Sequence, residues 1–173
     1  MEILEVIRNR RSVRAYSSKD VPDATVDTLL EYARWAPSAG NMQPWEFVVV
    51  RSLERKRRLA EAALGQSFVE EAPVVIVVCA NPSRSATRYG GRGASLYCLQ
   101  DTAAAAQNIH LAACALGLAT CWVGAFDEAS AARVLKLPEG IRPVAIISVG
   151  YPEERPSPPS RRKLSEIVHK EEF

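Results

Sequence analysis

The sequence predicts an α/β domain in which layers of helices pack against a buried β-sheet. Segments with helical periodicity alternate with short apolar runs along nearly the whole chain. The chain has 173 residues, 47% of them apolar, which is enough for one sizeable core. Residues 1–173 show no internal repeat and no sign of a second part, so we expect a single domain.

The first half of the chain is predicted to hold three helices and two strands. Pro22 suits the first turn of a helix whose apolar face contains Val26, Leu29, Leu30 and Ala33. In order, we expect helices near residues 3–7, from Pro22 to before Pro37 and from Ser52 to about Leu64, with strands over 46–51 and 73–80. The second strand is a continuous β-branched run, as expected of a strand that is covered on both faces.

The second half is predicted to contain a long helix, two strands and a terminal arm. Residues 81–93 are polar and rich in Gly and Ser, so we expect a loop there. An alanine-rich helical pattern over 94–116 ends at Gly117, which suits a C-cap. Four prolines in 152–159 favour an extended arm, so residues 152–173 should form this arm and a short helix ending near His169. The remaining expected elements are a strand over 120–125, a helix over 128–135 and a strand over 144–149.

Charge and cysteine content argue against several classes of function. The net charge is only +2, which gives no reason to expect DNA or an anionic membrane as a partner. The four cysteines form no C-x-x-C pair and lie in apolar segments beside only two histidines, which argues against a disulfide framework or a zinc site. No signal-peptide core follows Met1 and the apolar runs are too short to span a bilayer, so we expect a cytoplasmic protein.

A cationic cluster lies at the end of the first helical pattern. It contains Arg8, Arg10, Arg11 and Arg14, with Ser12 among them. Guanidinium groups match phosphate oxygens in pairs, and a serine hydroxyl adds a short donor. For an isolated Arg-Arg-Ser, a solvated basic face is the more common explanation. A nucleic-acid contact is a third interpretation, although the basic segments 51–58 and 161–163 are not interleaved with aromatic side chains.

Residues 36–45, between a predicted helix and a predicted strand, read Ala-Pro-Ser-Ala-Gly-Asn-Met-Gln-Pro-Trp. Short side chains leave backbone N–H groups exposed, and the amides of Asn41 and Gln43 add donors and acceptors. Such groups suit a flat, hydrogen-bonding ligand. An ordinary turn anchored by Trp45 explains part of the segment equally well. Together with the arginine cluster, the loop suggests a phosphorylated aromatic cofactor, and FMN fits best.

Other cofactor and catalytic motifs are missing from the sequence. There is no G-x-G-x-x-G or Walker loop, and residues 90–93 lack that spacing, so we do not expect a Rossmann-type nicotinamide site. No Ser–His–Asp set and no metal-ligand set occurs, so hydrolase and metal-dependent interpretations lack their parts. Gly124 ends a predicted strand, where glycine is common and where it can also let a ligand ring approach the backbone.

Six ordered sequence blocks resemble the nitroreductase family of FMN-dependent oxidoreductases. They are residues 10–16, 36–45, 71–75, 100–108, 117–124 and 161–164. The resemblance runs through nearly the whole chain and implies a three-layer α-β-α fold with a mostly antiparallel central sheet. It also implies a homodimer that holds two FMN molecules at the subunit interface.

The resemblance also implies a set of cofactor contacts by motif position. One subunit would bind the phosphate through Arg10, Arg11 and Ser12, with further phosphate contacts from Arg161 and Lys163 and with Arg14 near flavin N1 and O2. The other subunit would cover the dimethylbenzene side and the ribityl chain with Pro37, Ser38, Ala39 and Asn41, and Gln43 belongs to the same signature. The backbone of Val123 and Gly124 would face flavin N5.

Some features depart from the larger members of the family. Val123 stands where they have an acidic residue, so a carboxylate role at this position is absent. A polar flavin contact before the second core strand corresponds to Gln66 or to Ser67. The chain also lacks the long insertions that often shape the acceptor pocket, which leaves the choice of acceptor open.

Three further residues lie near the start of the long helix. Tyr89 and Arg92, in the predicted loop before it, either line an acceptor pocket or belong to an ordinary surface loop. Asp101, inside the helix, is expected to support the helix and to take no part in catalysis.

The resemblance therefore implies an FMN-dependent NAD(P)H oxidoreductase. NADH or NADPH would reduce the flavin at N5 and leave, and a nitroaromatic, quinone or similar acceptor would then use the same face in a ping-pong cycle. Reductive dehalogenation and flavin breakdown occur on the same scaffold and stay open. A flavin-binding protein without turnover and a basic nucleic-acid-binding module are the alternatives from other classes.

Overall fold

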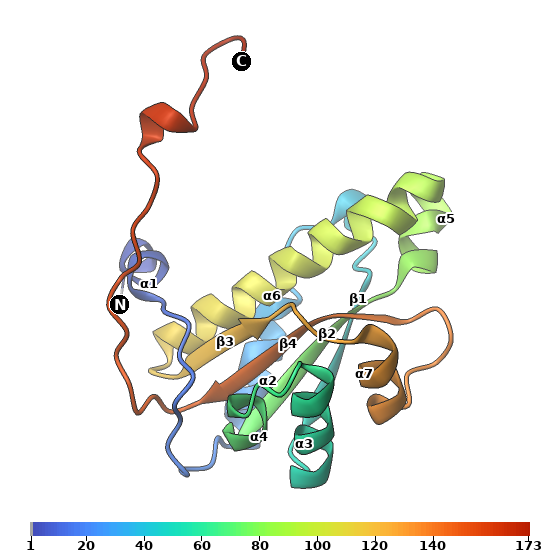
Figure 1. The fold of residues 1–173 in the computed structure, drawn as a ribbon. Coiled ribbons are helices and arrows are strands. Elements are labelled where there is room, and N and C mark those ends of the chain that lie inside the picture. Colours follow the sequence, from blue (N-terminus) through green and yellow to red (C-terminus); the bar gives the residue numbers. More distant parts are fainter. Residues whose placement is uncertain (1) are drawn as a thin grey trace.

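The computed structural model describes residues 2–173, and its centre is a four-stranded sheet with the strand order β1-β2-β4-β3 (Figure 1). All three strand pairs are antiparallel. The strands are β1 (Trp45–Val50), β2 (Val74–Ala80), β3 (Ala119–Val123) and β4 (Arg142–Gly150). Every residue of β2 is buried, as its β-branched sequence predicts for a central strand. The predicted strands are confirmed, with small shifts at their ends.

One face of the sheet is covered by α2 (Asp23–Ala33) and α6 (Cys98–Ala115). Leu29 and Ile109 extend from these helices onto Ile147 of the sheet, and all three side chains are fully buried. A fully buried side chain of this kind stabilises the fold by about 1.5–3 kcal/mol. The alanines of α6 let the helix lie close to its neighbours, so this layer is thin and well packed.

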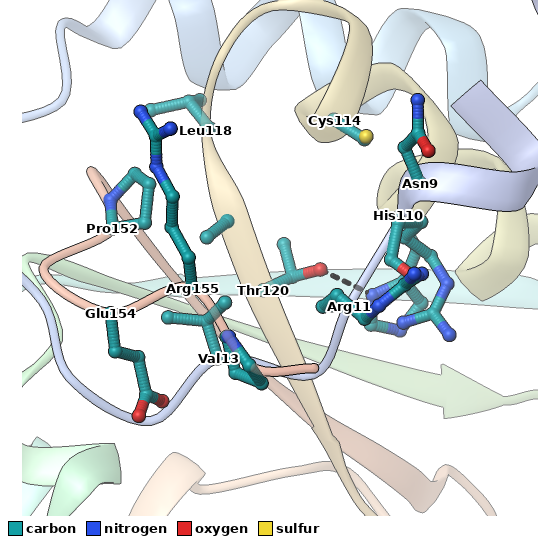
Figure 2. Close-up of a pocket in the computed structure, with 13 residues that line it drawn as sticks. Asn9, Arg11, Val13, His110, Cys114, Leu118, Thr120, Pro152, Glu154 and Arg155 are labelled. Atoms are coloured by element: carbon teal, nitrogen blue, oxygen red, sulfur yellow. Dashed lines mark hydrogen bonds between the residues drawn. The ribbon is translucent and has the colours of Figure 1, made fainter. Parts of the chain in front are cut away.

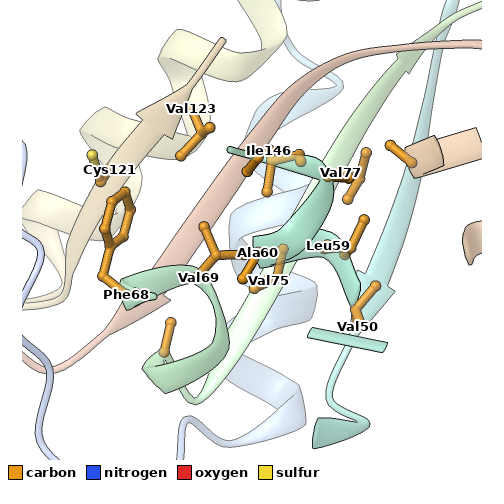
Figure 3. Close-up of a cluster of buried hydrophobic side chains, with 14 of the residues drawn as sticks. Val50, Leu59, Ala60, Phe68, Val69, Val75, Val77, Cys121, Val123 and Ile146 are labelled. Carbon is orange, nitrogen blue, oxygen red and sulfur yellow. The ribbon is translucent and has the colours of Figure 1, made fainter. Parts of the chain in front are cut away.

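The opposite face carries α3 (Leu53–Ala62), α4 (Phe68–Glu71) and α7 (Glu128–Leu135). Their apolar side chains, among them Leu59 and Phe68, gather over the valines of β2 in a second core cluster (Figure 3). Helices thus cover both faces of an antiparallel sheet. The expected three-layer α-β-α fold is confirmed.

The two ends of the chain meet beside the sheet and then separate. Helix α1 (Ile3–Asn9) leads into an extended segment in which Tyr16 pairs with Pro152. Beyond this point the arm runs past α1, with which Arg161 still lines a hollow, and its last part extends away from the body (Figure 1). Residues 157–173 are exposed throughout. The predicted arm is confirmed, but its helical part is one short turn, η3 (Leu164–Glu166), and does not reach His169.

Residues 81–93 form no loop, and this prediction was wrong. They contain α5 (Pro82–Arg92), which continues through one π-helical turn, η2 (Gly93–Tyr97), into α6. The Asn81 side chain accepts the Arg84 N–H at 3.1 Å and Pro82 occupies the first turn, which together start the helix. Gly90 (φ +53°) interrupts the helical backbone. The glycine and serine content hid this capping signal.

Candidate functional site

The segment that follows α1 runs in extended form beside β3. Arg10 leaves the helix with φ −55° and ψ 131°. Ser12 forms a parallel bridge with Thr120, whose carbonyl accepts the Val13 N–H at 3.1 Å. Val13 is buried in the core. Because side chains of an extended segment alternate, this burial turns the neighbouring Ser12 and Arg14 outward.

The same segment forms one wall of a pocket of about 480 Å³ (Figure 2). The C-terminal half of α6, the start of β3 and the first residues of the arm complete it. Arg10, Arg11 and Arg155 line the pocket together with a single carboxylate, Glu154. None of these arginines forms an ion pair within residues 2–173. The pocket therefore has a net positive charge and suits an anion.

The buried wall of this pocket contains an imidazole with one unused nitrogen. His110, on α6, is 2% exposed, and its Nδ1 lies 2.6 Å from Thr120 Oγ1. Its Nε2 has no hydrogen-bond partner. Burial, together with the charge of Arg10, lowers the pKa of His110 to about 4, so the ring is neutral at pH 7. A buried polar atom without a partner costs about 1–3 kcal/mol. Such an atom between unpaired arginines fits a pocket that is built for a polar, anionic group.

A second group of residues gathers where β3 ends. The Gln66 side chain donates a hydrogen bond to the Ala125 carbonyl, at 3.4 Å. Gln66 therefore lies beside Gly124 at the end of β3. The Val123 side chain is buried in the core, which leaves only its backbone for a ligand. Arg14 lies over the Phe68 ring, with 5.7 Å between the guanidinium carbon and the ring centroid. Among the predicted contacts, Arg14, Gln66 and Gly124 are thus close to the same edge of the sheet.

The loop between α2 and β1 has an ordered and partly left-handed backbone. Five residues of the expected cofactor contacts lie on it: Pro37, Ser38, Ala39, Asn41 and Gln43. The φ angles of Gly40, Asn41 and Gln43 are 55°, 56° and 50°. Ser38 accepts the Asn41 N–H at 2.9 Å through its carbonyl and the Gln43 N–H at 3.0 Å through its Oγ. Trp45 is buried behind the loop, as an anchor of the turn should be.

The arm reaches the cationic segment at two places. Glu154 accepts the backbone N–H of Arg14 at 2.5 Å. Further along the arm, Arg161 lines a hollow of about 790 Å³ with Arg8 and Arg11 of the N-terminal segment. This arrangement brings Arg161 to the predicted phosphate-binding residues. Lys163 is exposed and lines neither this hollow nor the cationic pocket.

Tyr89 and Arg92 both lie on α5, close to its junction with η2, and not on a surface loop. Arg92 donates to the Tyr97 hydroxyl at 3.0 Å, and the rings of Tyr89 and Tyr97 meet edge to face at 5.2 Å. The Tyr89 hydroxyl lies 2.6 Å from the point where a Cβ on Gly40 would be. Tyr89 therefore packs against the Ser38–Gln43 loop, which holds predicted cofactor contacts, and Arg92 is joined to it through Tyr97.

Metal and thiol chemistry find little support in the part of the chain that the structure describes. No group of three or more His, Cys, Asp or Glu in residues 2–173 could hold a metal ion. The four cysteines are free, and burial raises the pKa of Cys79 to about 12 and that of Cys121 above its ordinary value. Nor is any helix of these residues long and apolar enough to cross a membrane.

Comparison with known proteins identifies the family. The model of the nitroreductase family matches residues 7–71 and 64–151. The chain belongs to the nitroreductase family. It is 34% identical over 189 residues to an NADH dehydrogenase of Thermus thermophilus, with 92% of this chain and 91% of that protein covered. It is 26% identical over 185 residues to the FMN reductase (NAD(P)H) of Bacillus subtilis, with 99% and 74% covered.

A solved structure of a nitroreductase-family relative has the same fold. The NADPH:FMN oxidoreductase of Vibrio harveyi, complexed with NAD+, superimposes with a TM-score of 0.91 at 26% identity. The alignment covers 99% of this chain and 77% of that protein. Both the family resemblance of the sequence and the fold that it implied are confirmed.

The cationic pocket and the Ser38–Gln43 loop lie apart within one chain. The pocket with His110 lies toward the C-terminal end of α6, whereas Asp101, which contacts the Ser38–Gln43 loop, lies near its N-terminal end. These residues are about two and a half turns apart, roughly 14 Å along the helix axis. Figure 1 shows the same separation, with α1 at one end of α6 and α5 at the other.

Sequence patterns alone did not indicate the contacts of two residues near these groups. His110 gave no motif, because a single histidine in an alanine-rich helix has no local signature. Asp101 was expected to support its own helix, but its carboxylate accepts the N–H of Ala39, 62 residues away. Neither the His110–Thr120 contact nor the Asp101–Ala39 contact produces a periodic pattern in the sequence. The one available signal was the aspartate itself, a charged residue in an alanine-rich helix.

Proposed function

We propose that this protein is an FMN-dependent oxidoreductase that passes electrons from NAD(P)H through flavin N5 to a nitroaromatic, quinone or similar acceptor by a ping-pong mechanism. Membership of the nitroreductase family supports oxidoreductase chemistry with FMN and NAD(P)H. The single observation that carries the proposal is the pocket beside β3, where Arg10 and Arg11 have no carboxylate partner and His110 has an unused nitrogen.

The cationic pocket would hold the phosphate of FMN. Arg10 and Arg11 line it from the N-terminal segment, and Arg161 lines an adjoining hollow with Arg11. Ser12, which follows them in the chain, would add its hydroxyl. Charge-assisted hydrogen bonds from guanidinium groups to phosphate are among the strongest in proteins. Lys163 would add a further contact once the arm packs against a ligand or a second subunit.

The edge of the sheet near Gly124 would hold the flavin ring. Arg14 supplies a fixed positive charge, which stabilises the anion that forms near N1 and O2 on reduction. Gln66 offers a polar contact, and the backbone at Val123 and Gly124 offers N–H groups toward N5. When bound, FMN supplies the two-electron chemistry, while these residues orient it and set its electrostatic surroundings.

A ping-pong cycle agrees with the missing dinucleotide fingerprint. If NADH or NADPH stacks on the ring and leaves before the acceptor binds, one open face serves both reactants. No separate nicotinamide domain is then required. Tyr89 and Arg92, which pack near the Ser38–Gln43 loop, would border this shared face and influence the choice of acceptor.

The protein would act as a homodimer. Large apolar side chains on α1, α2 and α6 line a hollow of about 430 Å³ on the outer surface, and Trp35 is 72% exposed there. Such a patch on a small protein favours association. A second copy would also bring the Ser38–Gln43 loop of one subunit to the cationic pocket of the other, which one chain alone does not do. Sedimentation of the purified protein checks this, with the dimer mass expected at micromolar concentration.

An anaerobic absorbance spectrum tests the proposal. The purified protein, loaded with FMN and freed of excess by dialysis, should show bound flavin absorbance that NADH or NADPH bleaches. A nitroaromatic or a quinone, added after the nicotinamide has been removed, should then restore the spectrum of oxidised flavin. A ping-pong cycle requires that the two substrates react in separate steps in this way.

Three other outcomes point elsewhere. Bound flavin that neither nicotinamide bleaches indicates a flavin-binding protein without turnover. Bleaching that only halogenated aromatics reverse indicates dehalogenation, and absorbance that oxygen fails to restore, because the flavin is consumed, indicates flavin breakdown. A protein that retains no FMN but binds DNA or RNA with strong salt dependence contradicts the proposal altogether.

A further inference from the structure

The Ser38–Gln43 loop has a backbone conformation that its own sequence does not favour. Gly40 tolerates a positive φ, but Asn41 and Gln43 have positive φ angles as well. A residue other than glycine in this region costs about 1–2 kcal/mol. Such a conformation persists only where the surrounding structure over-determines it. Ser38 bonds Asn41 and Gln43 from within the loop, and contacts from outside fix the loop on the rest of the protein.

Helix α6 supplies such a contact through a buried carboxylate. Asp101 is only 7% exposed, and the Ala39 N–H lies 3.2 Å from each of its two oxygens. Hydrogen bonds to an ionised acceptor are stronger than those between neutral groups. The bond joins two segments that are 62 residues apart, so it fixes the loop on the helix directly.

Helix α5 closes the loop from the other side. Arg88 Nη1 lies 3.5 Å from the Gly40 carbonyl, and the Tyr89 hydroxyl approaches Gly40 so closely that a Cβ there would be only 2.6 Å away. The loop is thus held between two helices. The hydrogen bond from Ala39 to Asp101 on α6 is shorter than the one from Arg88 on α5, and only Asp101 has a buried side chain.

We propose that Asp101 is a positioning residue, whose carboxylate sets the Ser38–Gln43 loop, through the Ala39 N–H, in the conformation that covers FMN bound by the other subunit. This inference rests on the proposed function. It assigns a role in cofactor binding to a residue that would touch neither the cofactor nor the reacting atoms.

The negative charge of Asp101 does not itself stabilise the fold at neutral pH. Burial raises the pKa of this carboxyl, and the Ala39 N–H only partly opposes the shift. A raised pKa in the folded state means that the stability this group provides is greatest at low pH and is lost as pH rises through that pKa. At neutral pH, an uncharged amide of the same size should therefore keep the fold intact.

Two substitutions of different chemistry test the proposal. Asp101→Leu keeps the branching of the side chain in a larger volume and removes the acceptor, and we expect it to weaken FMN affinity about tenfold or more. Asp101→Asn keeps one oxygen that can accept the Ala39 N–H, so its FMN affinity should lie between those of Asp101→Leu and the wild type. Fluorescence titration of the apoprotein with FMN measures the affinity, and urea unfolding of the apoprotein measures stability at the same pH.

A matched control separates loop positioning from the general loss of a carboxylate. Asp127 also accepts a backbone N–H, from Ser130 at 2.7 Å, but at the start of α7 on the opposite face of the sheet. Asp127→Leu removes this acceptor as Asp101→Leu removes the other, so it should lower the stability of the apoprotein and leave FMN affinity unchanged. Hydrogen exchange adds a readout without cofactor, because the Ala39 amide should lose protection in Asp101→Leu and keep it in Asp127→Leu.

Mixed dimers test whether the loop acts on the other subunit. When differently tagged Asp101→Leu and Arg10→Ala subunits are co-expressed and the heterodimer is purified, one of its two sites should combine an intact arginine segment with an intact loop. We expect one high-affinity FMN per heterodimer, although both parent homodimers bind weakly. Two weak sites in the heterodimer would overturn the inference.

The failures of the two proposals are distinguishable. Equal FMN affinity of the wild type and Asp101→Leu, with equal protection of the Ala39 amide, overturns this inference and leaves the proposed function standing. A wild-type protein without FMN affinity overturns both. Unfolding of Asp101→Leu and Asp101→Asn alike, with no affinity recovered by the asparagine, would show a structural role and would also contradict the inference.

Discussion

The two ends of α6 differ in how their buried polar groups are satisfied. Near its N-terminal end, the Asp101 carboxylate is bonded to the Ala39 N–H within the same chain. Toward its C-terminal end, His110 has a free Nε2 beside arginines that lack carboxylate partners. The first end is complete without a ligand, whereas the second has polar groups that only a ligand or a partner can satisfy.

This difference separates two tasks that a cofactor site requires. A covering loop must have its shape before the cofactor arrives, because ordering it on binding would reduce the affinity. A phosphate-binding pocket must instead keep its donors free, and unpaired cations and unused nitrogens destabilise the empty protein. In the proposed homodimer, the two ends of α6 would carry these two tasks, and the loop of one subunit would complete the pocket of the other.

The largest expected effect follows from removing the cations of the pocket. Arg10→Ala combined with Arg11→Ala should weaken FMN affinity by about 3–6 kcal/mol, because each change removes a charge-assisted hydrogen bond to phosphate. Titration of the apoprotein with FMN measures this, and the absorbance spectrum of any bound flavin should change little. The matched control is Arg55→Ala with Arg58→Ala on α3, which removes the same charge from exposed positions. Equal losses in both double variants would contradict a specific phosphate site.

Acid should weaken the C-terminal end of α6 through His110. Burial and the Arg10 charge lower the pKa of His110 from 6.5 to about 4 in the folded protein. The contribution of neutral His110 to the free energy of unfolding is therefore fully present above pH 6.5 and is lost as pH falls toward 4. The shift corresponds to about 3 kcal/mol. Urea unfolding of the apoprotein at pH 7 and at pH 4 should show this loss in the wild type and a smaller loss in His110→Gln, whose side chain does not titrate.

Arg14 should affect the flavin potential more than the retention of FMN. Arg14→Ala removes a fixed positive charge near N1 and O2, so the reduced cofactor should lose about 1–3 kcal/mol of stabilisation and the midpoint potential should fall. Arg14→Lys keeps the charge and should recover most of the potential. Reductive titration with a reference dye measures both. An unchanged potential in Arg14→Ala with FMN still bound would exclude this role.

The sequence predicted the layers of the fold well because burial leaves a local pattern. The β-branched run of β2 and the apolar stripes of α2 and α6 follow directly from which faces are covered. Helix α5 was missed because its start depends on two residues, Asn81 and Pro82, while its composition resembles that of a loop. Composition predicts a helix poorly where a capping residue determines whether the helix starts.

The residues of the proposed site were indicated by sequence only where they form contiguous motifs. The arginine segment and the Ser38–Gln43 loop each occupy one short stretch, so their residue types alone indicated a phosphate and a flat ligand. The contacts of His110 with Thr120 and of Asp101 with Ala39 join separate elements. Such pairs depend on the three-dimensional packing of α6, which no short stretch of sequence encodes.

The smallest expected effect concerns the shape of the loop itself. Gly40 has a φ of +55°, so Gly40→Ala should strain the backbone by about 1 kcal/mol. Its Cβ would also meet the Tyr89 hydroxyl at 2.6 Å, although the end of that side chain can move. We expect FMN affinity to fall severalfold, measured by fluorescence titration.

Gly140→Ala is the control, because Gly140 has a φ of +85° and a Cβ there would touch nothing within 4 Å. Both variants should lose similar unfolding free energy, since the backbone strain is alike. Only Gly40→Ala should lose FMN affinity, because only its strain lies in the segment that α5 and α6 hold in place. If both variants bind FMN as the wild type does, the detailed shape of the loop does not matter for affinity, and the bond from Asp101 to Ala39 would then serve the fold alone.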